Sequence, residues 1–334
     1  MKIIVTGGTG FLGRHVVKKL LDGGHVVRVL ARRGSERRRL SEGSDGNLTA
    51  VEIVPGDLRD TASLDRAVSG MEAVCHCAAH METSSPWRDF EEVTIRGTER
   101  LLEAACRHSV GRFLHVSSLG IFGTGSGTIT EDSPLDDGLE SRGAYTRSKA
   151  EAERVVWEYH RERNLPVTVI RPGLLYGPGK SPVVARVSFS IGSKLRVAIG
   201  LSQQRLPLAY VEDVADAIHL ALNNDRAIGK AYNVVDDGIL QKEYLALLRR
   251  AKLTRTRTIL ISPEPIYPLL SMLERSCRWL RIRPPVSRHQ FERALASIHY
   301  DTTRARRDLG WSPRVHVADG LRRIRAASGG PLVS

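Results

Sequence analysis

Three glycines spaced three residues apart near the start of the chain constrain its fold more than any other feature. They lie at positions 7, 10 and 13, between the apolar run 2–5 and a segment, 11–21, with apolar residues at helical spacing. In such a strand–turn–helix unit the glycines permit, in order, a tight turn, a close approach of backbone to a bound anion, and close packing of helix on strand. The free N–H groups at the helix N-terminus attract anions, so the pattern predicts a phosphate-binding turn rather than a plain glycine-rich loop.

Strand and helix patterns then alternate through the first half of the chain. The predicted strands are 2–5, 25–30, 50–54, 72–77, 112–117 and 167–170, and the predicted helices are 11–21, 61–68, 90–107 and 145–163. Repeated β-α units predict an α/β fold of Rossmann type, in which a doubly wound parallel sheet binds ligands at the carboxyl ends of its strands.

The second half of the chain is less regular. The pattern is lost over 173–200, returns as a helix at 211–222 and a strand at 231–235, and continues from 237 to 330 as short helices interrupted by prolines. We therefore predict two interleaved parts. A dinucleotide-binding Rossmann domain is formed by 1–172 and 206–236, and a smaller, mostly helical C-terminal lobe that binds the substrate is formed by 173–205 and 237–330.

The composition excludes several classes of protein. Apolar residues make up 41% and charged residues 26% of the 334 positions, which is typical of a globular chain. No apolar run approaches the ~20 residues that span a bilayer, and the N-terminus has no signal-peptide pattern, so we expect a cytoplasmic protein without a membrane span. The four cysteines have neither metal-ligand nor CxxC spacing, which predicts reduced thiols and no metal site.

The formal net charge of +13 raises the question of a polyanionic partner. The arginine clusters are scattered along the chain, interleaved with acids and not accompanied by an aromatic platform, so we expect no nucleic-acid partner. One apolar segment of the predicted lobe, 259–273, could face the substrate, a second subunit or a membrane surface, although ordinary packing within the lobe is the favoured interpretation.

The ends of the next strands indicate how a dinucleotide would be held. The second strand ends in Arg32 and Arg33 with no carboxylate, which favours the 2′-phosphate of NADP over the free ribose of NAD; solvated arginines are the alternative. Asp57 could accept a hydrogen bond from the adenine amino group, and Asp60 is better placed to cap the following helix. The small pair Ala78-Ala79 would let a cofactor pass close to the backbone.

Two further segments carry groups suited to acid–base chemistry. Tyr145 and Lys149 have the i,i+4 spacing that puts both side chains on one helix face. A free tyrosine has a pKa near ~10, and a neighbouring ammonium is expected to lower it. The serines of Ser117-Ser118, at the end of the fifth predicted strand, could hold a substrate oxygen near Tyr145, with a turn or helix cap as the structural alternative.

These residues form a set that resembles the extended short-chain dehydrogenases/reductases, also called the NAD-dependent epimerase/dehydratase superfamily. The chain is most similar to the branch of dihydroflavonol reductase and 3β-hydroxysteroid dehydrogenase. The motifs that carry the resemblance cover nearly the whole sequence: TGGTGFLG at 6–13, GDL at 56–58, CHCAAH at 75–80, SSLGIFG at 117–123, YTRSK at 145–149, RPGLLYGPG at 171–179, YVEDVADA at 210–217 and LGWSPRV at 309–315.

The resemblance implies roles for individual residues. Ser118, Tyr145 and Lys149 would be the catalytic residues, and Lys149 would also contact the nicotinamide ribose. The implied cofactor contacts, together with those expected from the residues themselves, are Gly7, Thr9, Gly10, Phe11, Leu12, Gly13, Arg32, Arg33, Asp57, Leu58, Ala78, Ala79, Tyr145, Lys149, Pro172 and Leu175. A homodimer would be common in this family.

Three departures from the family pattern bear on the reaction. Dehydratases carry an Asp-Glu pair where this chain has Leu119-Gly120, which argues against dehydration. Nucleotide-sugar enzymes place an Asn in the stretch where Leu174 follows Gly173, which argues for the reductase branch. The family's usual Asn before the Gly-Thr pair is Thr94, which puts a water-mediated proton relay in doubt.

We therefore predict an NADP-dependent carbonyl reductase or alcohol dehydrogenase that acts on a small organic molecule, with NAD as the alternative cofactor. A nucleotide-sugar epimerase is the second hypothesis, because Arg205 lies where such enzymes grip the nucleotide. A non-catalytic dinucleotide sensor or nucleic-acid-binding protein, suggested only by the charge, is the third.

Overall fold

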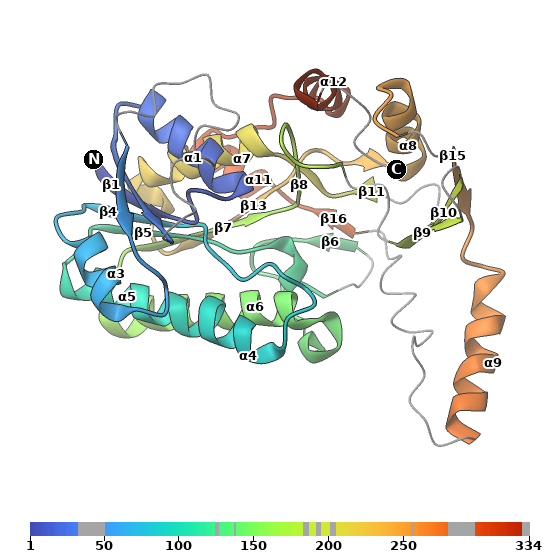
Figure 1. The fold of residues 1–334 in the computed structure, drawn as a ribbon, viewed down its shortest axis with the longest axis horizontal. Helices are drawn as coiled ribbons and strands as arrows, with labels where there is room; N and C mark the ends of the chain where they lie inside the picture. The colour runs from blue at the N-terminus through green and yellow to red at the C-terminus, as the bar shows by residue number, and fades with distance from the viewer. Residues whose placement is uncertain are drawn as a thin grey trace.

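The computed structural model describes residues 1–32, 51–123, 127–136, 138–182, 187–191, 195–200, 205–254, 257–279 and 298–328. Its centre is a parallel seven-stranded sheet with the order β13-β7-β5-β4-β1-β2-β3 (Figure 1). These strands are β1 (Lys2–Thr6), β2 (Val26–Ala31), β3 (Glu52–Pro55), β4 (Ala73–His76), β5 (Arg112–Val116), β7 (Val167–Pro172) and β13 (Lys230–Val234). The doubly wound Rossmann-type fold that the β-α pattern predicted is thus confirmed.

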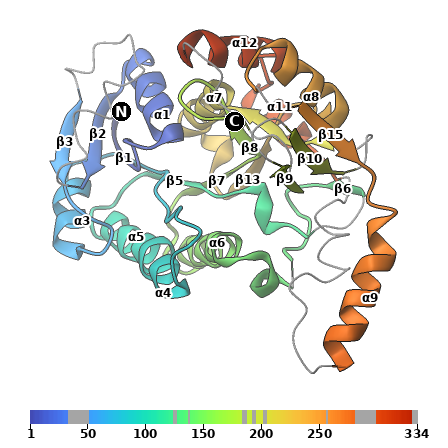
Figure 2. The same ribbon diagram turned by 45° about the vertical axis from the view of Figure 1, so that its right-hand side comes forward.

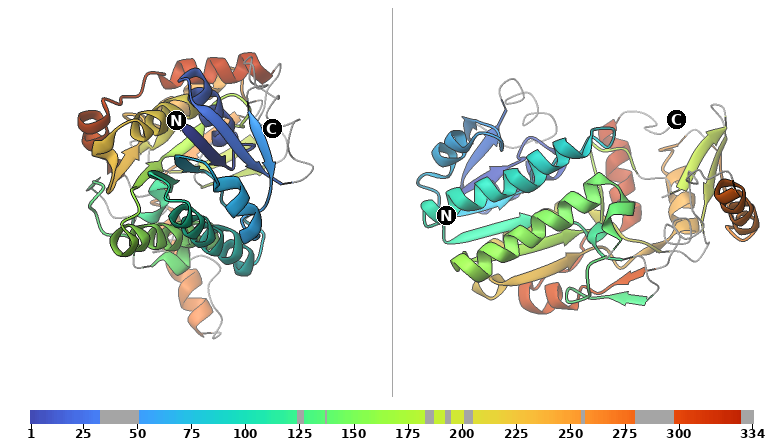
Figure 3. Two further views of the ribbon diagram at one scale, coloured as in Figure 1. Left: turned by 90° about the vertical axis from the view of Figure 1, so that its left-hand side faces the viewer. Right: turned by 90° about the horizontal axis from the view of Figure 1, so that it is seen from below.

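Helices cover both faces of the sheet, which explains why its strands are apolar on successive positions. On one face, Ile3 and Val5 of β1 pack with α1 (Phe11–Asp22), α7 (Val211–Leu222) and α11 (Thr303–Leu309). On the other face, Ile4 of β1 packs with α3 (Thr61–Val68), α5 (Gly97–Arg107) and α6 (Ala144–Arg163). The right-hand view of Figure 3 shows the teal and green helices α5 and α6 lying across this second face.

The segment predicted as one helix over 90–107 has an irregular start. It consists of a short helix α4 (Trp87–Phe90), a π-helical turn η2 (Glu91–Arg96) and the regular helix α5. One extra residue per turn in η2 alters which side chains face inward, and Thr94 is fully buried there. Such π-helical turns are rare in proteins, and those that occur are often found at functional sites. The periodicity of apolar residues does not reveal them.

The remaining part of the chain contains more strand than its sequence indicated. Three strands, β9 (Val187–Ile191), β10 (Leu195–Ile199) and β15 (Arg257–Ile261), form a small sheet in the order β15-β10-β9. The pairs β8 (Leu174–Tyr176) with β12 (Leu208–Tyr210), β11 (Arg205–Leu206) with β14 (Ile239–Leu240), and β6 (Gly127–Ile129) with β16 (Ile298–Tyr300) are shorter. The helices of this part are α8 (Gln241–Arg250), α9 (Ile266–Trp279) and α12 (Val317–Ser328).

Two expectations from composition can be compared with the structure. All four cysteines are free thiols, as their spacing predicted. Within the described ranges, every helix is either too short or too polar to cross a lipid bilayer.

Candidate active site

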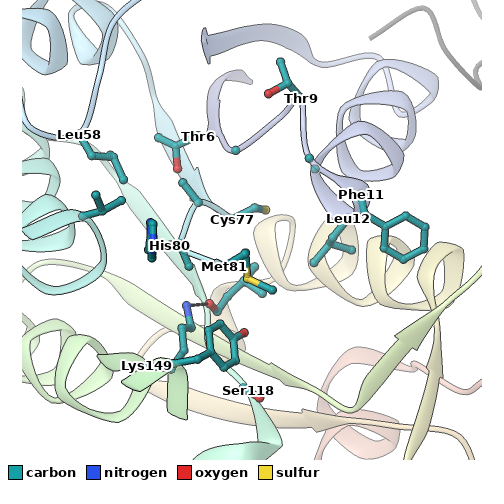
Figure 4. A pocket seen from close by; sticks show the side chains of 18 of the residues that line it. Thr6, Thr9, Phe11, Leu12, Leu58, Cys77, His80, Met81, Ser118 and Lys149 are labelled. Carbon is teal, nitrogen blue, oxygen red and sulfur yellow. Dashed lines mark hydrogen bonds between the residues drawn. The ribbon is translucent and has the colours of Figure 1, made fainter. Parts of the chain in front are cut away.

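A cleft of about 860 Å³ opens at the carboxyl ends of the central strands (Figure 4). This is the size of cleft that accommodates cofactors and small ligands. Fifteen of the sixteen residues that the sequence analysis assigned to the cofactor, and all three assigned to catalysis, line it. The sixteenth, Arg33, lies outside the described residues.

The glycine turn between β1 and α1 has the geometry that the sequence predicted. Gly7 has a φ of +70°, and a Cβ atom on it would lie 2.7 Å from the backbone nitrogen of Ala78. A Cβ on Gly13 would lie 2.0 Å from the carbonyl oxygen of Gly7. The first turn of α1 has no acidic side chain, so nothing opposes the partial positive charge of the helix N-terminus. The turn therefore fits a diphosphate at this end of the cleft.

Gly13→Ala tests this turn directly. The added methyl group cannot fit beside the Gly7 carbonyl, so α1 must move away from β1. We expect no detectable dinucleotide binding at concentrations that saturate the wild type, and a Tm several degrees lower, since overpacking costs about 1–3 kcal/mol. Binding is measured by isothermal titration calorimetry and Tm by circular dichroism. The control is Gly123→Ala, because a Cβ on Gly123 meets nothing within 4 Å; wild-type affinity in Gly13→Ala would contradict the assignment.

The end of the cleft beside β2 and β3 carries two arginines. Arg32 and Arg59 are both exposed and both line the cleft. Asp57 also lines it, and its carboxylate accepts a 3.0 Å hydrogen bond from the backbone N–H of Arg59. Asp60 caps α3 by accepting from the N–H groups of Ala62 and Ser63, as predicted. Arg59 was not predicted as a cleft residue from the sequence, although its position two residues after Asp57 could have indicated it.

A buried chain of hydrogen bonds supports the loop that follows β4. The backbone N–H of His80 donates to Thr94 Oγ1 at 3.0 Å, so Thr94, which replaces the family's usual Asn, anchors the loop. Thr98 Oγ1 donates to the Thr94 carbonyl at 2.5 Å and lies 2.9 Å from His76 Nε2. Thr6 Oγ1 lies 2.6 Å from His76 Nδ1.

The state of His76 follows from these contacts. Burial and the nearby Lys149 lower the pKa of His76 to about 3, so the ring is neutral. Because Thr98 Oγ1 already donates to a carbonyl, it accepts from His76 Nε2–H, and Nδ1 accepts from Thr6 Oγ1. This chain joins β1, β4 and α5 beneath the cleft, and sequence spacing gave no sign of it.

Two adjacent serines reach the cleft from the end of β5. Ser118 Oγ accepts a 3.0 Å hydrogen bond from the N–H of Gly120 and caps the 3₁₀ turn η3 (Leu119–Ile121). A hydroxyl that accepts in this way still has its own hydrogen to donate to a ligand. Ser117 Oγ is buried and has no hydrogen-bond partner among the described residues. Ser118 can therefore cap the turn and donate a hydrogen bond to a ligand at the same time.

Helix α6 brings Tyr145 and Lys149 to the same cleft. Lys149 is only 2% exposed, and its ammonium donates to the carbonyl oxygen of Val116 (Figure 4). Burial lowers the pKa of Lys149 to about 8, and the carboxylate of Glu153 opposes this shift. Burial raises the pKa of the Tyr145 phenol, the opposite of the direction expected from its spacing to Lys149. Desolvation is the larger influence on the phenol here, and it keeps Tyr145 protonated.

A buried ion pair holds α6 against β7. Arg171 and Glu153 are 5% and 1% exposed, and Arg171 Nη2 and Nε lie 2.5 and 3.1 Å from Glu153 Oε1. Trp157 Nε1 donates to the same carboxylate at 3.1 Å, and Arg171 Nη1 donates to the Glu131 carbonyl at 2.8 Å. Glu153 lies one helical turn after Lys149, so the pair fixes the part of α6 that carries the lysine.

The cleft also contains residues that the sequence analysis did not assign. They are mainly apolar or basic: Thr6, Leu30, Ala31, Gly56, Arg59, Cys77, His80, Met81, Glu82, Val93, Val116, Gly173, Leu174 and Lys180. Arg205, on which the epimerase hypothesis rested, is not among the lining residues. Its guanidinium donates to the carbonyl of Gly238 at 2.9 Å.

Comparison with known proteins agrees with this geometry. The model of the NAD dependent epimerase/dehydratase family matches residues 3–235. The chain is similar to the 2-alkyl-3-oxoalkanoate reductase of Stenotrophomonas maltophilia (strain K279a), with 28% identity over 98% of this chain and 99% of the relative. It is also similar to the dTDP-glucose 4,6-dehydratase of Streptomyces niveus, with 30% identity over 96% and 90% of the two chains.

A solved structure shows the same arrangement. The crystal structure of DesIV, a dTDP-glucose 4,6-dehydratase from Streptomyces venezuelae with NAD and TYD bound, matches with a TM-score of 0.74 and 25% identity, over 98% of this chain and 96% of that one. Together with the glycine turn and the cleft at the strand ends, the match over residues 3–235 shows that the chain belongs to the NAD-dependent epimerase/dehydratase family, the extended short-chain dehydrogenases/reductases.

Proposed function

We propose that this enzyme is an NADP-dependent reductase of ketones or aldehydes, which also oxidises the corresponding alcohols. The observation that carries the proposal is the meeting of Ser118, Tyr145 and Lys149 in the cleft that begins at the Gly7–Gly13 turn. A reductase needs a hydrogen-bond donor for the carbonyl oxygen, a proton donor and a bound hydride source in one place.

The residues present fit a dinucleotide along the strand ends. The turn would offer backbone N–H groups to the diphosphate, Asp57 would accept from the adenine amino group, and Ala78 and Ala79 would leave room beside the cofactor; all of them line the cleft. When bound, the nicotinamide would supply the hydride. Lys149, buried beneath the cleft, would hold the nicotinamide ribose.

The chain's own groups would handle the substrate oxygen. Ser118, whose Oγ accepts from Gly120, would donate its hydrogen to the carbonyl oxygen and polarise the bond. Tyr145 would transfer its phenolic proton to that oxygen as negative charge develops there. Because burial raises rather than lowers the pKa of Tyr145, the phenol carries its proton at neutral pH, as a proton donor must.

The reductase is favoured over the alternatives by the substrate side of the cleft. Leu119 and Gly120 lie at the positions where a dehydratase has its acids, and Arg205 does not line the cleft. The lining side chains Met81, Val93 and Leu174 are apolar, and Figure 4 shows Met81 pointing into the cleft. These features favour a carbonyl compound with an apolar body, as the name of the Stenotrophomonas relative indicates for its substrate.

The activity is tested by following NADPH oxidation with a panel of ketones of increasing apolar size, 3-oxo acids and their 2-alkyl derivatives included. We expect turnover that rises with the apolar size of the substrate. The alternative, a nucleotide-sugar epimerase, is tested by titrating the protein with a UDP- or dTDP-sugar in a calorimeter. Tight sugar-nucleotide binding without turnover of any carbonyl compound would overturn the proposal.

The preference for NADP is proposed from charge. Arg32, directly after β2, is not a carboxylate, and Arg32 and Arg59 are exposed and line the cleft, where each would be able to bond a 2′-phosphate. Arg32→Ala is expected to weaken NADPH binding about tenfold or more and NADH binding less than about twofold, since a charge-assisted hydrogen bond contributes about 1.5–3 kcal/mol.

Fluorescence titration of both cofactors measures this preference. The matched control is Arg161→Ala, an exposed arginine of α6 outside the cleft, which should change neither affinity. Equal affinity of the wild type for NADPH and NADH would assign the enzyme to NAD instead.

A further inference from the structure

Helix α9 exposes an unusual amount of apolar surface. Leu269, Met272, Leu273 and Trp279 are 62%, 63%, 38% and 84% exposed. At 100° per residue these four side chains lie within about a third of the helix circumference. They form an apolar stripe whose one polar member, Ser276, donates its hydroxyl hydrogen to the Met272 carbonyl within the helix. A helix in water normally turns such a stripe inward, whereas α9 projects away from the sheet and its covering helices (Figures 1 and 2).

The charged positions of α9 lie outside this stripe: by helical spacing Arg275 borders it, and Glu274 and Arg278 lie on the opposite side of the helix. Arg275 is exposed and lies beside Trp279 by the same spacing, and Cys277 is buried. A basic side chain at the margin of an apolar stripe can extend its charged end toward anionic groups while its stem covers apolar surface. The net charge of +13 on the whole chain adds a general attraction to anionic surfaces.

The strand that leads into α9 extends the apolar character. Ile259 and Ile261 of β15 are 42% and 40% exposed, and their i,i+2 spacing puts them on the same side of the strand. The continuous segment from β15 through α9 therefore exposes six large apolar side chains.

The structure assigns α9 as a membrane-docking helix that lies in the plane of an anionic lipid surface. This is the arrangement typical of amphipathic interfacial helices, with tryptophan at the level of the headgroups. The stripe consists of four side chains of one helix, whereas a stable protein interface takes roughly 20–30 residues from each partner. A lipid surface needs no complementary shape, so a stripe of this size suffices. The assignment does not depend on the proposed reaction.

Vesicle binding of the full chain tests the assignment. The protein is sedimented with vesicles of phosphatidylcholine alone or with about 30% phosphatidylglycerol, the latter a composition that attracts basic surfaces. We expect binding to the anionic vesicles that weakens with added salt. Addition of these vesicles should also shift the tryptophan emission to the blue, and Trp279→Phe should remove most of that shift.

Variants connect the binding to α9. The triple variant Leu269→Gln, Met272→Gln, Trp279→Gln is expected to lower the partition coefficient at least tenfold, and Arg275→Glu to lower it several-fold for anionic vesicles only. The matched control is Val26→Gln, which removes an apolar side chain that is 57% exposed on β2, and it should bind like the wild type. Unchanged circular dichroism and dinucleotide affinity would show that the variants are folded.

Three outcomes would overturn the assignment. One is the absence of binding to either vesicle, and another is equal binding by the triple variant and the wild type. The third is a dimer in analytical ultracentrifugation that the triple variant converts to a monomer, which would assign the stripe to a second copy of the chain.

Discussion

Replacing Tyr145 with Phe is expected to lower kcat for carbonyl reduction about 10³-fold, because the substrate oxygen loses its proton donor. Burial keeps the phenol protonated in the cleft, so no other side chain has to be recruited for this step in the wild type. The ring of phenylalanine fills nearly the same volume, and the dinucleotide affinity should stay within about twofold of the wild type. Steady-state kinetics with NADPH and a fluorescence titration measure the two quantities.

The comparison variant for this experiment is Tyr159→Phe, later on the same helix. Its hydroxyl lies 3.5 Å from Glu103 and outside the cleft, so the variant should have wild-type activity. If Tyr145→Phe kept more than about a tenth of the wild-type kcat, Tyr145 would not be the proton donor and the proposed mechanism would fail.

Glu153→Gln is expected to affect both stability and the pH profile. The change leaves the Arg171 guanidinium buried without its carboxylate, which should cost about 3–5 kcal/mol and lower Tm by roughly 5–10 °C. The carboxylate also raises the pKa of Lys149, which burial lowers to about 8. The ammonium is therefore lost as the pH rises through about 8 in the wild type, and at a lower pH in the variant. The alkaline limb of kcat/KM should shift to lower pH accordingly.

Two further variants separate these effects. Glu151→Gln removes a partly exposed carboxylate of α6 that pairs with Arg147, and it should change neither Tm nor the pH profile measurably. Glu153→Gln combined with Arg171→Met removes both charges and should recover part of the lost stability, but not the position of the alkaline limb. An alkaline limb that stays in place in both Glu153 variants would show that Lys149 does not control it.

The sequence predicted well which residues would come together in the cleft, because the signals are local. The glycines of the turn, the pair Tyr145 and Lys149, and Ser118 at the end of β5 each lie within one strand–loop–helix unit. In such units the backbone geometry follows from a few neighbouring residues, as the φ of Gly7 and the close approach of Gly13 to Gly7 illustrate. The parallel order of the strands then brings these units to one edge of the sheet.

The supporting contacts could not be predicted in the same way. One hydrogen bond joins the His80 N–H, in the loop after β4, to Thr94 in η2. Another joins His76 of β4 to Thr98 of α5. The π-helical turn that places Thr94 differs from a regular helix only in register, which apolar periodicity does not resolve. Desolvation of Tyr145 also depends on what surrounds it, so the direction of its pKa shift was not accessible from the spacing to Lys149.

By itself, the sequence determined the family and the doubly wound sheet, and it pointed to the residues that we propose as the reacting groups, since these inferences depend on periodicity and on short motifs. The tertiary structure decided the contacts and surroundings of particular side chains. Glu153 pairs with Arg171, Arg59 lines the same cleft as Arg32, Arg205 lies outside that cleft, and α9 has its apolar stripe exposed. The physical reason is that burial and charge pairing arise between residues distant in the chain, and their energies depend on the packed environment rather than on residue type.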